Sequence, residues 1–224
     1  MDYQTTQRKY LSVSAVKVQG VCETKVLETI EGKAAKTPAM KAGIAAHEKL
    51  AEALPKISKE EIIESIRSGK AADIRELPVF DPKLHITGRI DHLSVTGMIE
   101  NGKNTAIVID DKFPNSTSAF HGFTLYYKLQ LAAYAAALAN SYEYGNICRI
   151  VGARLIYRDR QTGNATEQYN MGRDRLETCV SNVGMAADNA WRVYRRQQEP
   201  VHRRFDVENG EWVGCFCNAD NGKA

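Results

Sequence analysis

The stretch TAIVIDDKFP, residues 105–114, decides how this chain is interpreted. Its apolar and β-branched run is typical of a buried strand, yet the run ends abruptly in Asp110, Asp111 and Lys112. Side chains two residues apart on a strand project from the same face, so we expect Asp110 and Lys112 to point to one side. An ion pair at the end of a surface strand would explain these charges, but it would not account for the matching polar residues elsewhere in the chain.

A second acid, Asp91 in GRIDHL, precedes the turn signal ENGKN at residues 100–104. This turn lies about midway between Asp91 and Asp110, and Asn-Gly is typical of a β-hairpin. If the strands pair across it, the two carboxylates come close, and like charges repel unless a cation lies between them. We therefore predict a divalent metal between Asp91 and Asp110, with Lys112 positioning an attacking water.

Apolar periodicity and turn residues predict an α/β fold, and 224 residues suit a single domain over 1–224. We expect a short helix from Ser12 or Ser14, broken at Gly20 and leading to a second. Further predicted helices cover 37–54, 58–69, 121–145 and 173–198. Predicted strands cover 74–80, 84–97, 104–112, 148–159 and 166–171, the second and third of them antiparallel. The chain after Pro200 is predicted to be irregular.

The formal charge of +3 is mildly basic and compatible with a polyanionic partner. Basic and aromatic residues alternate in WRVYRRQQEPVHRRF, residues 191–205, where Arg192, Arg195 and Arg196 are candidate DNA contacts. The alternative is a solvated helix face with its aromatic side in the core. No apolar run approaches the roughly 20 residues of a membrane span, and the N-terminus lacks the apolar core of a secretory signal, so we expect a cytoplasmic protein without a membrane partner.

Four short motifs follow one another along the chain: GIAAH at 43–47, GRID at 88–91, IDDK at 109–112 and QLAAY at 130–134. In this order, on helix, strand, strand and helix, they resemble the motifs of the PD-(D/E)XK nucleases of the RecB type. Within that group the chain most resembles the CRISPR-associated Cas-four exonucleases, because LSVSAVKVQGVCETKVLE at 11–28 matches their N-terminal helix with a cysteine ahead of the G-x-x-x-H motif.

The resemblance implies a restriction-endonuclease-like core, with a mixed central sheet flanked by helices. It also implies a phosphodiesterase that acts on DNA with Mg²⁺ or Mn²⁺. The implied metal ligands are His47, Asp91, Asp110 and the Asp111 carbonyl. Lys112 would position the water, and Gln130 and Tyr134 would support the site or touch the scissile strand. The implied ligands and Lys112 agree with the argument from the hairpin, since metal-assisted hydrolysis needs clustered oxygen ligands and a group to orient water.

Five cysteines are an odd number and argue against a disulfide framework, which leaves thiol packing or metal ligation. Proteins of the Cas-four type tie an N-terminal cysteine to three C-terminal ones around an iron-sulfur cluster. Here Cys22, Cys215 and Cys217 are the implied ligands, with Cys179 or His202 as the fourth, while Cys148 is expected to pack as a small hydrophobe. Segments 1–35 and 199–224 would form a cysteine-bearing subregion. The competing interpretation is a patch of free thiols, because C-x-C departs from the family spacing.

Our leading hypothesis is a metal-dependent exonuclease that trims single-stranded DNA ends, in CRISPR spacer preparation with integrase proteins as partners and as a homo-oligomer. A non-catalytic DNA-binding or assembly subunit is the alternative from another class. The presence of both acids and the lysine favours the enzyme. A repair or recombination nuclease would share the chemistry and differ in context.

Overall fold

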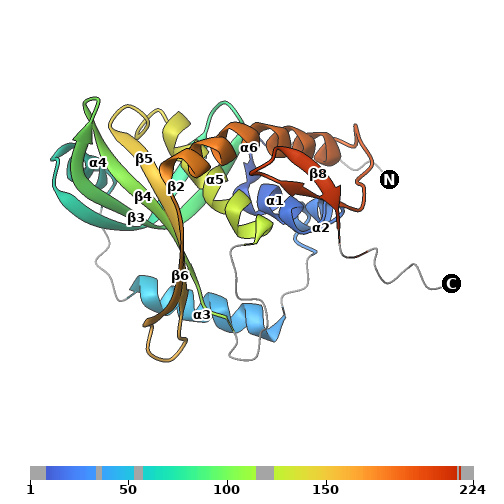
Figure 1. Cartoon of the computed structure of the whole chain (residues 1–224). Coiled ribbons are helices and arrows are strands. Elements are labelled where there is room, and N and C mark those ends of the chain that lie inside the picture. The colour runs from blue at the N-terminus through green and yellow to red at the C-terminus, as the bar shows by residue number, and fades with distance from the viewer. Residues whose placement is uncertain (1–8, 34–36, 53–57, 115–123, 216, 218–224) are drawn as a thin grey trace.

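The computed structural model of the chain describes residues 9–33, 37–52, 58–114, 124–215 and 217. As predicted, it is a mixed sheet flanked by helices (Figure 1). The strands are β1 (Leu11–Ser12), β2 (Ala71–Asp81), β3 (Ile86–Glu100), β4 (Lys103–Lys112), β5 (Cys148–Arg158), β6 (Ala165–Met171), β7 (Arg203–Asp206) and β8 (Glu211–Gly214). The helices are α1 (Val13–Lys17), the 3-10 helix η1 (Val18–Gly20), α2 (Lys25–Ile30), α3 (Pro38–Glu52), α4 (Lys59–Arg67), α5 (Leu125–Asn140) and α6 (Arg173–Tyr194).

The main sheet is built around β3, which pairs antiparallel with both β2 and β4 and parallel with the short β1. Strand β4 then pairs parallel with β5, and β5 pairs antiparallel with β6. A parallel neighbour requires a crossover connection, and α5 supplies it between β4 and β5. The sheet therefore combines a local hairpin with a helical crossover, and the two meet at β4.

The β3–β4 hairpin forms as its sequence predicts. Asn101 and Gly102 have φ values of 50° and 74°, which suits the tight turn that Asn-Gly favours. The register runs to the pair His92–Ile109, with a bulge between Val95 and Ile99. The strands are antiparallel, as expected, and their register sets which side chains face each other at the far end.

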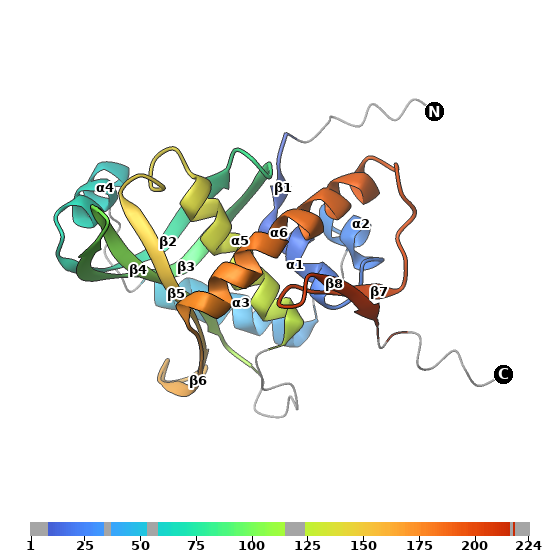
Figure 2. The same ribbon diagram turned by 45° about the horizontal axis from the view of Figure 1, so that its top comes forward.

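Helix α5 forms the centre of the core. All ten residues from Leu129 to Leu138 are buried, as expected for a helix that is apolar on every side. Helix α6 packs across α5 and against β5, while α3 lies apart from both (Figures 1 and 2). Within the described ranges, no helix is long and apolar enough to cross a membrane.

The N-terminal segment folds against the beginning of α5. The Ser12 side chain caps α1 by accepting the Ala15 N–H at 3.2 Å. At Gly20 an added Cβ would lie 2.6 Å from backbone atoms of Tyr126, so only glycine permits this approach. The predicted break at Gly20 is confirmed, and it brings η1 against α5.

Three predicted features of the fold are wrong. Helix α5 ends at Asn140 rather than near Gly145, because Ser141 is extended and Gly145 folds back so closely that a Cβ would overlap the Ala139 carbonyl. Helix α6 ends at Tyr194 rather than residue 198, since Arg196 adopts a left-handed φ of 56°.

The third error concerns the chain after Pro200, which is not irregular. Strands β7 and β8 form an antiparallel hairpin. Phe205 on β7 is fully buried, and its ring centroid lies 5.0 Å from that of Trp212 on β8. The aromatic pair attaches this hairpin to the helical end of the molecule, beside α1 and α2 (Figure 1).

Candidate functional site

Two aspartates meet where β3 and β4 run side by side. The paired register ends at His92–Ile109, so that Asp91 and Asp110 are the next residues on the two strands. The backbone N–H of Asp111 donates to Asp91 Oδ2 at 3.1 Å. Asp110 is completely buried. The structure thus brings together the two carboxylates that we expected to face each other across the hairpin.

Burial and neighbouring charges drive the pKa values of these two carboxyls apart. Burial raises the pKa of Asp110 to about 6, helped by the charge of Asp91 and opposed by that of Lys112. Burial acts in the same direction on Asp91, but the hydrogen bond from His47 and the charge of Lys112 outweigh it and hold the pKa of Asp91 at about 2. Asp110 Oδ1 has no hydrogen-bond donor among the described residues. A buried carboxylate oxygen without a donor is one that a cation would stabilise.

His47, on α3, reaches the same carboxylate. Its Nε2 lies 2.9 Å from Asp91 Oδ2, and its Nδ1 lies 3.5 Å from Glu76 Oε1. The hydrogen bond to Asp91 raises the pKa of His47 against the effect of burial. One ligand atom from each of His47, Glu76 and Asp91 lies within 4.8 Å of the others. This donor set, with Asp110 beside it, fits a divalent cation.

Glu76 is a member of this group that the sequence did not reveal. It lies within β2, where the ladder to β3 is intact on both sides but skips this residue. Its φ of 51° falls in the left-handed region, which is uncommon for a residue with a side chain. Strained backbone of this kind collects at functional sites. Nothing in the surrounding letters RELPVF distinguishes this acid from an ordinary surface glutamate.

Two lysines lie beside the aspartates. Lys112 Nζ is 2.5 Å from Asp110 Oδ2, and although burial opposes it, the charges of Asp110 and Asp91 raise the pKa of Lys112. Lys17, on α1, sits over the Tyr126 ring at 4.9 Å. Burial and then the charge of Lys112 lower the pKa of Lys17 to about 8. Sequence patterns missed Lys17, since a lysine on a short helix is normally solvated.

Gln130 and Tyr134 lie one turn apart on α5, close to the aspartates, and both are buried. Gln130 Nε2 donates to the Tyr134 hydroxyl at 3.4 Å. Burial, together with the charges of the two aspartates, raises the pKa of Tyr134, so the phenol stays protonated. Gly88 of the GRID motif makes room for this ring, because an added Cβ would lie 2.7 Å from Tyr134 Cε1.

The Asp111 side chain has a different environment from that of Asp110. Its two oxygens accept hydrogen bonds from Arg75 Nη1 at 2.6 Å and from Arg158 Nε at 2.7 Å. The carboxylate is fully buried and neutralised by the two guanidinium groups. It therefore anchors β4 to β2 and β5. The metal contact that we predicted concerns the main-chain carbonyl of Asp111 and stays a prediction.

A cleft of about 830 Å³ opens beside His47 and Glu76. Arg89 lines it and extends into solvent, with its guanidinium 3.6 Å from Glu76. Two of the candidate metal ligands, His47 and Glu76, therefore border a space large enough for a substrate.

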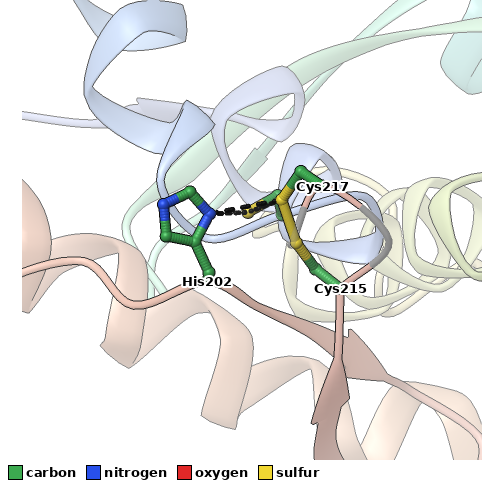
Figure 3. Close-up of side chains that lie close together, drawn as sticks. His202, Cys215 and Cys217 are labelled. Carbon is green, nitrogen blue, oxygen red and sulfur yellow. Dashed lines mark hydrogen bonds between the residues drawn. A yellow bond between two sulfur atoms is a disulfide. The ribbon is translucent and has the colours of Figure 1, made fainter. Parts of the chain in front are cut away.

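The cysteines at the two ends of the chain come together with a histidine (Figure 3). One ligand atom from each of Cys22, His202, Cys215 and Cys217 lies within 4.8 Å of the others. The terminal cluster, as we name these four residues, contains three of the predicted cysteines and takes His202 as its fourth member. In the structure a disulfide joins Cys215 to Cys217.

Cys179, which we predicted as a fourth ligand, lies outside the terminal cluster. It is fully buried on α6, and burial raises the pKa of its thiol to about 11. Cys148 is buried at the start of β5, and burial raises the pKa of its thiol to about 12. Both therefore stay protonated at neutral pH and pack as small hydrophobic side chains.

The candidate DNA contacts Arg192, Arg195 and Arg196 are exposed at the end of α6. Arg192 pairs with Asp188 at 2.9 Å, and Arg195 covers the Trp191 ring at 4.9 Å. Trp191 itself donates from Nε1 to a backbone carbonyl at 3.1 Å and packs against the core. The aromatic side of this segment thus faces inward, while the role of the three arginines in DNA binding stays a prediction.

The family model of the PD-(D/E)XK nuclease superfamily matches residues 11–209. No curated protein matches the chain. A candidate exonuclease from Eubacterium rectale has a similar fold, with a TM-score of 0.51 and 15% identity over 100% of this chain and 94% of that one. An alkaline exonuclease from Laribacter hongkongensis gives a TM-score of 0.47 and 13% identity over 84% of this chain and 89% of that one. Since the family model spans most of the sequence, the chain belongs to the PD-(D/E)XK nuclease superfamily.

Proposed function

We propose that the protein is a metal-dependent exonuclease that hydrolyses phosphodiester bonds at the ends of single-stranded DNA. The observation that carries this proposal is the meeting of a buried and a half-buried aspartate with a lysine and with a histidine and a glutamate that line a cleft. The residues are Asp91, Asp110, His47, Glu76 and Lys112. Clustered oxygen ligands beside an ammonium group suit metal-assisted phosphodiester hydrolysis.

The position of each side chain indicates its role in the proposed reaction. Asp91 and Asp110 would hold Mg²⁺ or Mn²⁺, with His47 and Glu76 completing the donor set. When bound, the cation supplies charge neutralisation at the phosphate and a more acidic water. Lys112 is an ammonium held by Asp110, so it donates hydrogen bonds to the attacking water or to a phosphate oxygen and does not accept a proton.

Other residues position these groups or the substrate. Gln130 and Tyr134 would support the aspartates from α5, as their burial and hydrogen bond suggest. The substrate strand would enter the cleft beside His47, where the exposed guanidinium of Arg89 is placed to contact a phosphate. This path would bring a phosphodiester to His47 and Glu76, the two candidate ligands that line the cleft.

The preference for single-stranded ends is supported by the motif resemblance to the Cas-four exonucleases. The same resemblance underlies a role in CRISPR spacer preparation, with integrase proteins as partners and a homo-oligomeric assembly. A repair or recombination nuclease would use identical chemistry, and gene neighbourhood would separate the two roles.

The test compares linear and circular single-stranded DNA, and linear duplex DNA, in the presence of Mn²⁺. We expect the linear single strand to be shortened from its end, and Asp110→Asn and Lys112→Ala to lower the rate on the order of 100-fold or more. Asp174→Asn is the matched control, because Asp174 is an exposed aspartate on the first turn of α6. Equal rates in wild type and the two site variants would disprove the site. Equal cleavage of circles would disprove the exonuclease.

A further inference from the structure

The terminal cluster is separate from the candidate active site and joins distant parts of the chain. Cys22 lies between η1 and α2, whereas His202, Cys215 and Cys217 flank the β7–β8 hairpin (Figure 3). Arg203 pairs with Gly214 at the open end of that hairpin. The next residues outward on the two strands are His202 and Cys215, which therefore lie near each other. The hairpin therefore preorganises two of the four ligand atoms.

A buried polar network holds Cys22 next to His202. Glu23, which follows Cys22, is fully buried, and its N–H donates to the Arg203 carbonyl at 2.8 Å. The Glu23 carboxylate accepts from Arg203 Nε at 2.5 Å and from Gln198 Nε2 at 2.9 Å. Cys22 and His202 are thus each followed in sequence by a residue of this network, Glu23 and Arg203. The approach of Cys22 to His202 is a consequence of the fold and does not depend on the sulfur atoms alone.

Three of the six distances among the ligand atoms are close to the edges of a tetrahedron around one ion. Cys22 Sγ lies 3.8 Å from His202 Nδ1 and 3.4 Å from Cys217 Sγ, and His202 Nδ1 lies 3.2 Å from Cys217 Sγ. Zinc-ligand distances of about 2.3 Å for sulfur and about 2.0 Å for nitrogen imply edges of about 3.8 Å between two sulfurs and about 3.5 Å between sulfur and nitrogen. The sulfurs of Cys215 and Cys217 are bonded to each other here and must separate on reduction. The Thr24 hydroxyl, 3.1 Å from Cys22 Sγ, can donate to a thiolate at that position.

An iron-sulfur cluster, which the family resemblance implies, fits this spacing less well. Such a cluster places inorganic sulfide and more than one iron among its cysteine sulfurs, so the sulfurs spread farther than the ligands of a single ion. Three thiolates with one imidazole are instead a common donor set for structural zinc.

We propose that, with its cysteines reduced, the terminal cluster binds one Zn²⁺ in a tetrahedral Cys₃His site. The ion joins the N-terminal segment at Cys22 to the C-terminal hairpin and closes a site whose four positions are all occupied by protein. A closed site of this kind is structural, since no position is left for a substrate.

Zinc binding and the Cys215–Cys217 disulfide are alternative states of the same two sulfurs. A dithiol reductant supplies two electrons and two protons, which open the S–S bond to two thiols while the reductant becomes a disulfide. Zn²⁺ then displaces one proton from each of the three thiols, and these protons pass to the buffer. His202 binds as the neutral imidazole through Nδ1.

The test uses the full chain, purified anaerobically with a phosphine reductant. Elemental analysis is expected to give about one zinc per chain, without stoichiometric iron or acid-labile sulfide. Exchange of zinc for Co²⁺ is expected to produce visible ligand-field bands of tetrahedral cobalt and thiolate-to-cobalt charge transfer. Reduced protein that retains and takes up no zinc, or that contains iron with sulfide, would overturn the proposal.

Variants distinguish the loss of a zinc ligand from the loss of structure, and they distinguish the terminal cluster from the candidate active site. Cys22→Ser and His202→Ala should weaken zinc at least tenfold in competition with a chelator, whereas Cys179→Ala, a cysteine outside the cluster, should not. His47→Ala should keep its zinc, because His47 belongs to the candidate active site. His202→Cys should retain zinc and strengthen the thiolate-to-cobalt band, which loss of structure would not do. Zinc held equally tightly by Cys22→Ser, or lost from His47→Ala, would refute the site.

Discussion

Asp110 and Asp111 are neighbours in sequence, yet the structure predicts that replacing Asp111 by asparagine costs more stability than replacing Asp110. The Asp111 carboxylate accepts hydrogen bonds from Arg75 at 2.6 Å and Arg158 at 2.7 Å, and it is fully buried. Hydrogen bonds to charged groups contribute about 1.5–3 kcal/mol each, and breaking a buried ion pair costs about 3–5 kcal/mol. Asparagine keeps one acceptor oxygen, so Asp111→Asn should lower the free energy of unfolding by about 2–4 kcal/mol.

At Asp110, by contrast, ionisation of the buried carboxyl lowers the stability of the folded protein. Its pKa is raised from 3.8 to about 6, chiefly by burial, so ionisation is less favourable in the folded than in the unfolded protein. For an acid with a raised pKa, stability falls as pH rises from about 4 through 6 and stays lower above that. The gap corresponds to about 3 kcal/mol at most, and loss of the ion pair with Lys112 offsets part of it. Because the charge of Asp110 also raises the pKa of Lys112, its removal takes stability from the lysine while it relieves the cost of burying the carboxylate. Asp110→Asn should therefore lose less stability than Asp111→Asn at pH 7.5.

Urea and thermal unfolding, followed by circular dichroism without Mg²⁺ or Mn²⁺, measure both effects. For a chain of this length we expect the Asp111→Asn midpoint temperature to fall by about 5–15 °C. If Asp111→Asn has wild-type stability, or if Asp110→Asn loses more stability than Asp111→Asn, the reasoning is refuted. Asp111 would then not anchor the strands, or burial of the ionised Asp110 would not lower stability.

Three further predictions follow from other contacts. Gly88→Ala would place a carbon 2.7 Å from Tyr134 Cε1, so urea unfolding should show a loss of about 1–3 kcal/mol; an unchanged midpoint would contradict the packing. The pKa of Glu208 is lowered from 4.5 to about 2, chiefly by its hydrogen bond from Arg175 and also by Lys128 at 2.5 Å. Its contribution is therefore full above pH 4.5 and is lost toward pH 2, so Glu208→Gln should lower the thermal midpoint more at pH 7 than at pH 3, and equal shifts would argue against it. Omitting divalent cations should abolish nuclease activity and adding Mn²⁺ should restore it, whereas full activity in a chelator would exclude metal-dependent hydrolysis.

The part of the site that the sequence could predict is the part built by local structure. Asn101-Gly102 specifies a tight turn, and the flanking strands then have one register that buries their apolar faces. The pairs next to the turn, Glu100–Lys103 and Ile99–Asn104, would by themselves place Asp91 opposite Lys112. The bulge between Val95 and Ile99, which the turn does not predict, shifts the pairing so that Asp91 and Asp110 follow the last pair, His92–Ile109. Lys112 follows from the two-residue period of the strand, and its contact with Asp110 needs no distant partner.

Lys17 and Glu76 could not be found in this way, because their positions depend on non-local packing. Glu76 enters the site through the pairing of β2 with β3 and a left-handed backbone that no letter in its surroundings requires. Lys17 enters because α1 packs on α5, and a periodic pattern identifies the apolar face of a helix but not its neighbour.

The failure to predict the β7–β8 hairpin has a different cause, because the sequence signal for this hairpin is local. Asn209-Gly210 lies between two short strands, and Gly210 has a φ of 67°. Asn-Gly between alternating apolar residues is a hairpin signal, but strands of only four residues are easily overlooked. The choice between Cys179 and His202 depends on this hairpin, because its ends position His202 and Cys215 together.

The N-terminal segment links the two sites physically. Lys17 reaches the aspartates and Cys22 reaches the terminal cluster, and the connection between them is short and constrained. The Cys22 N–H donates to the Val18 carbonyl at 3.0 Å, and Gly20 lies directly against the backbone of Tyr126. The same short segment of chain therefore supplies a lysine to the candidate active site and a cysteine to the terminal cluster.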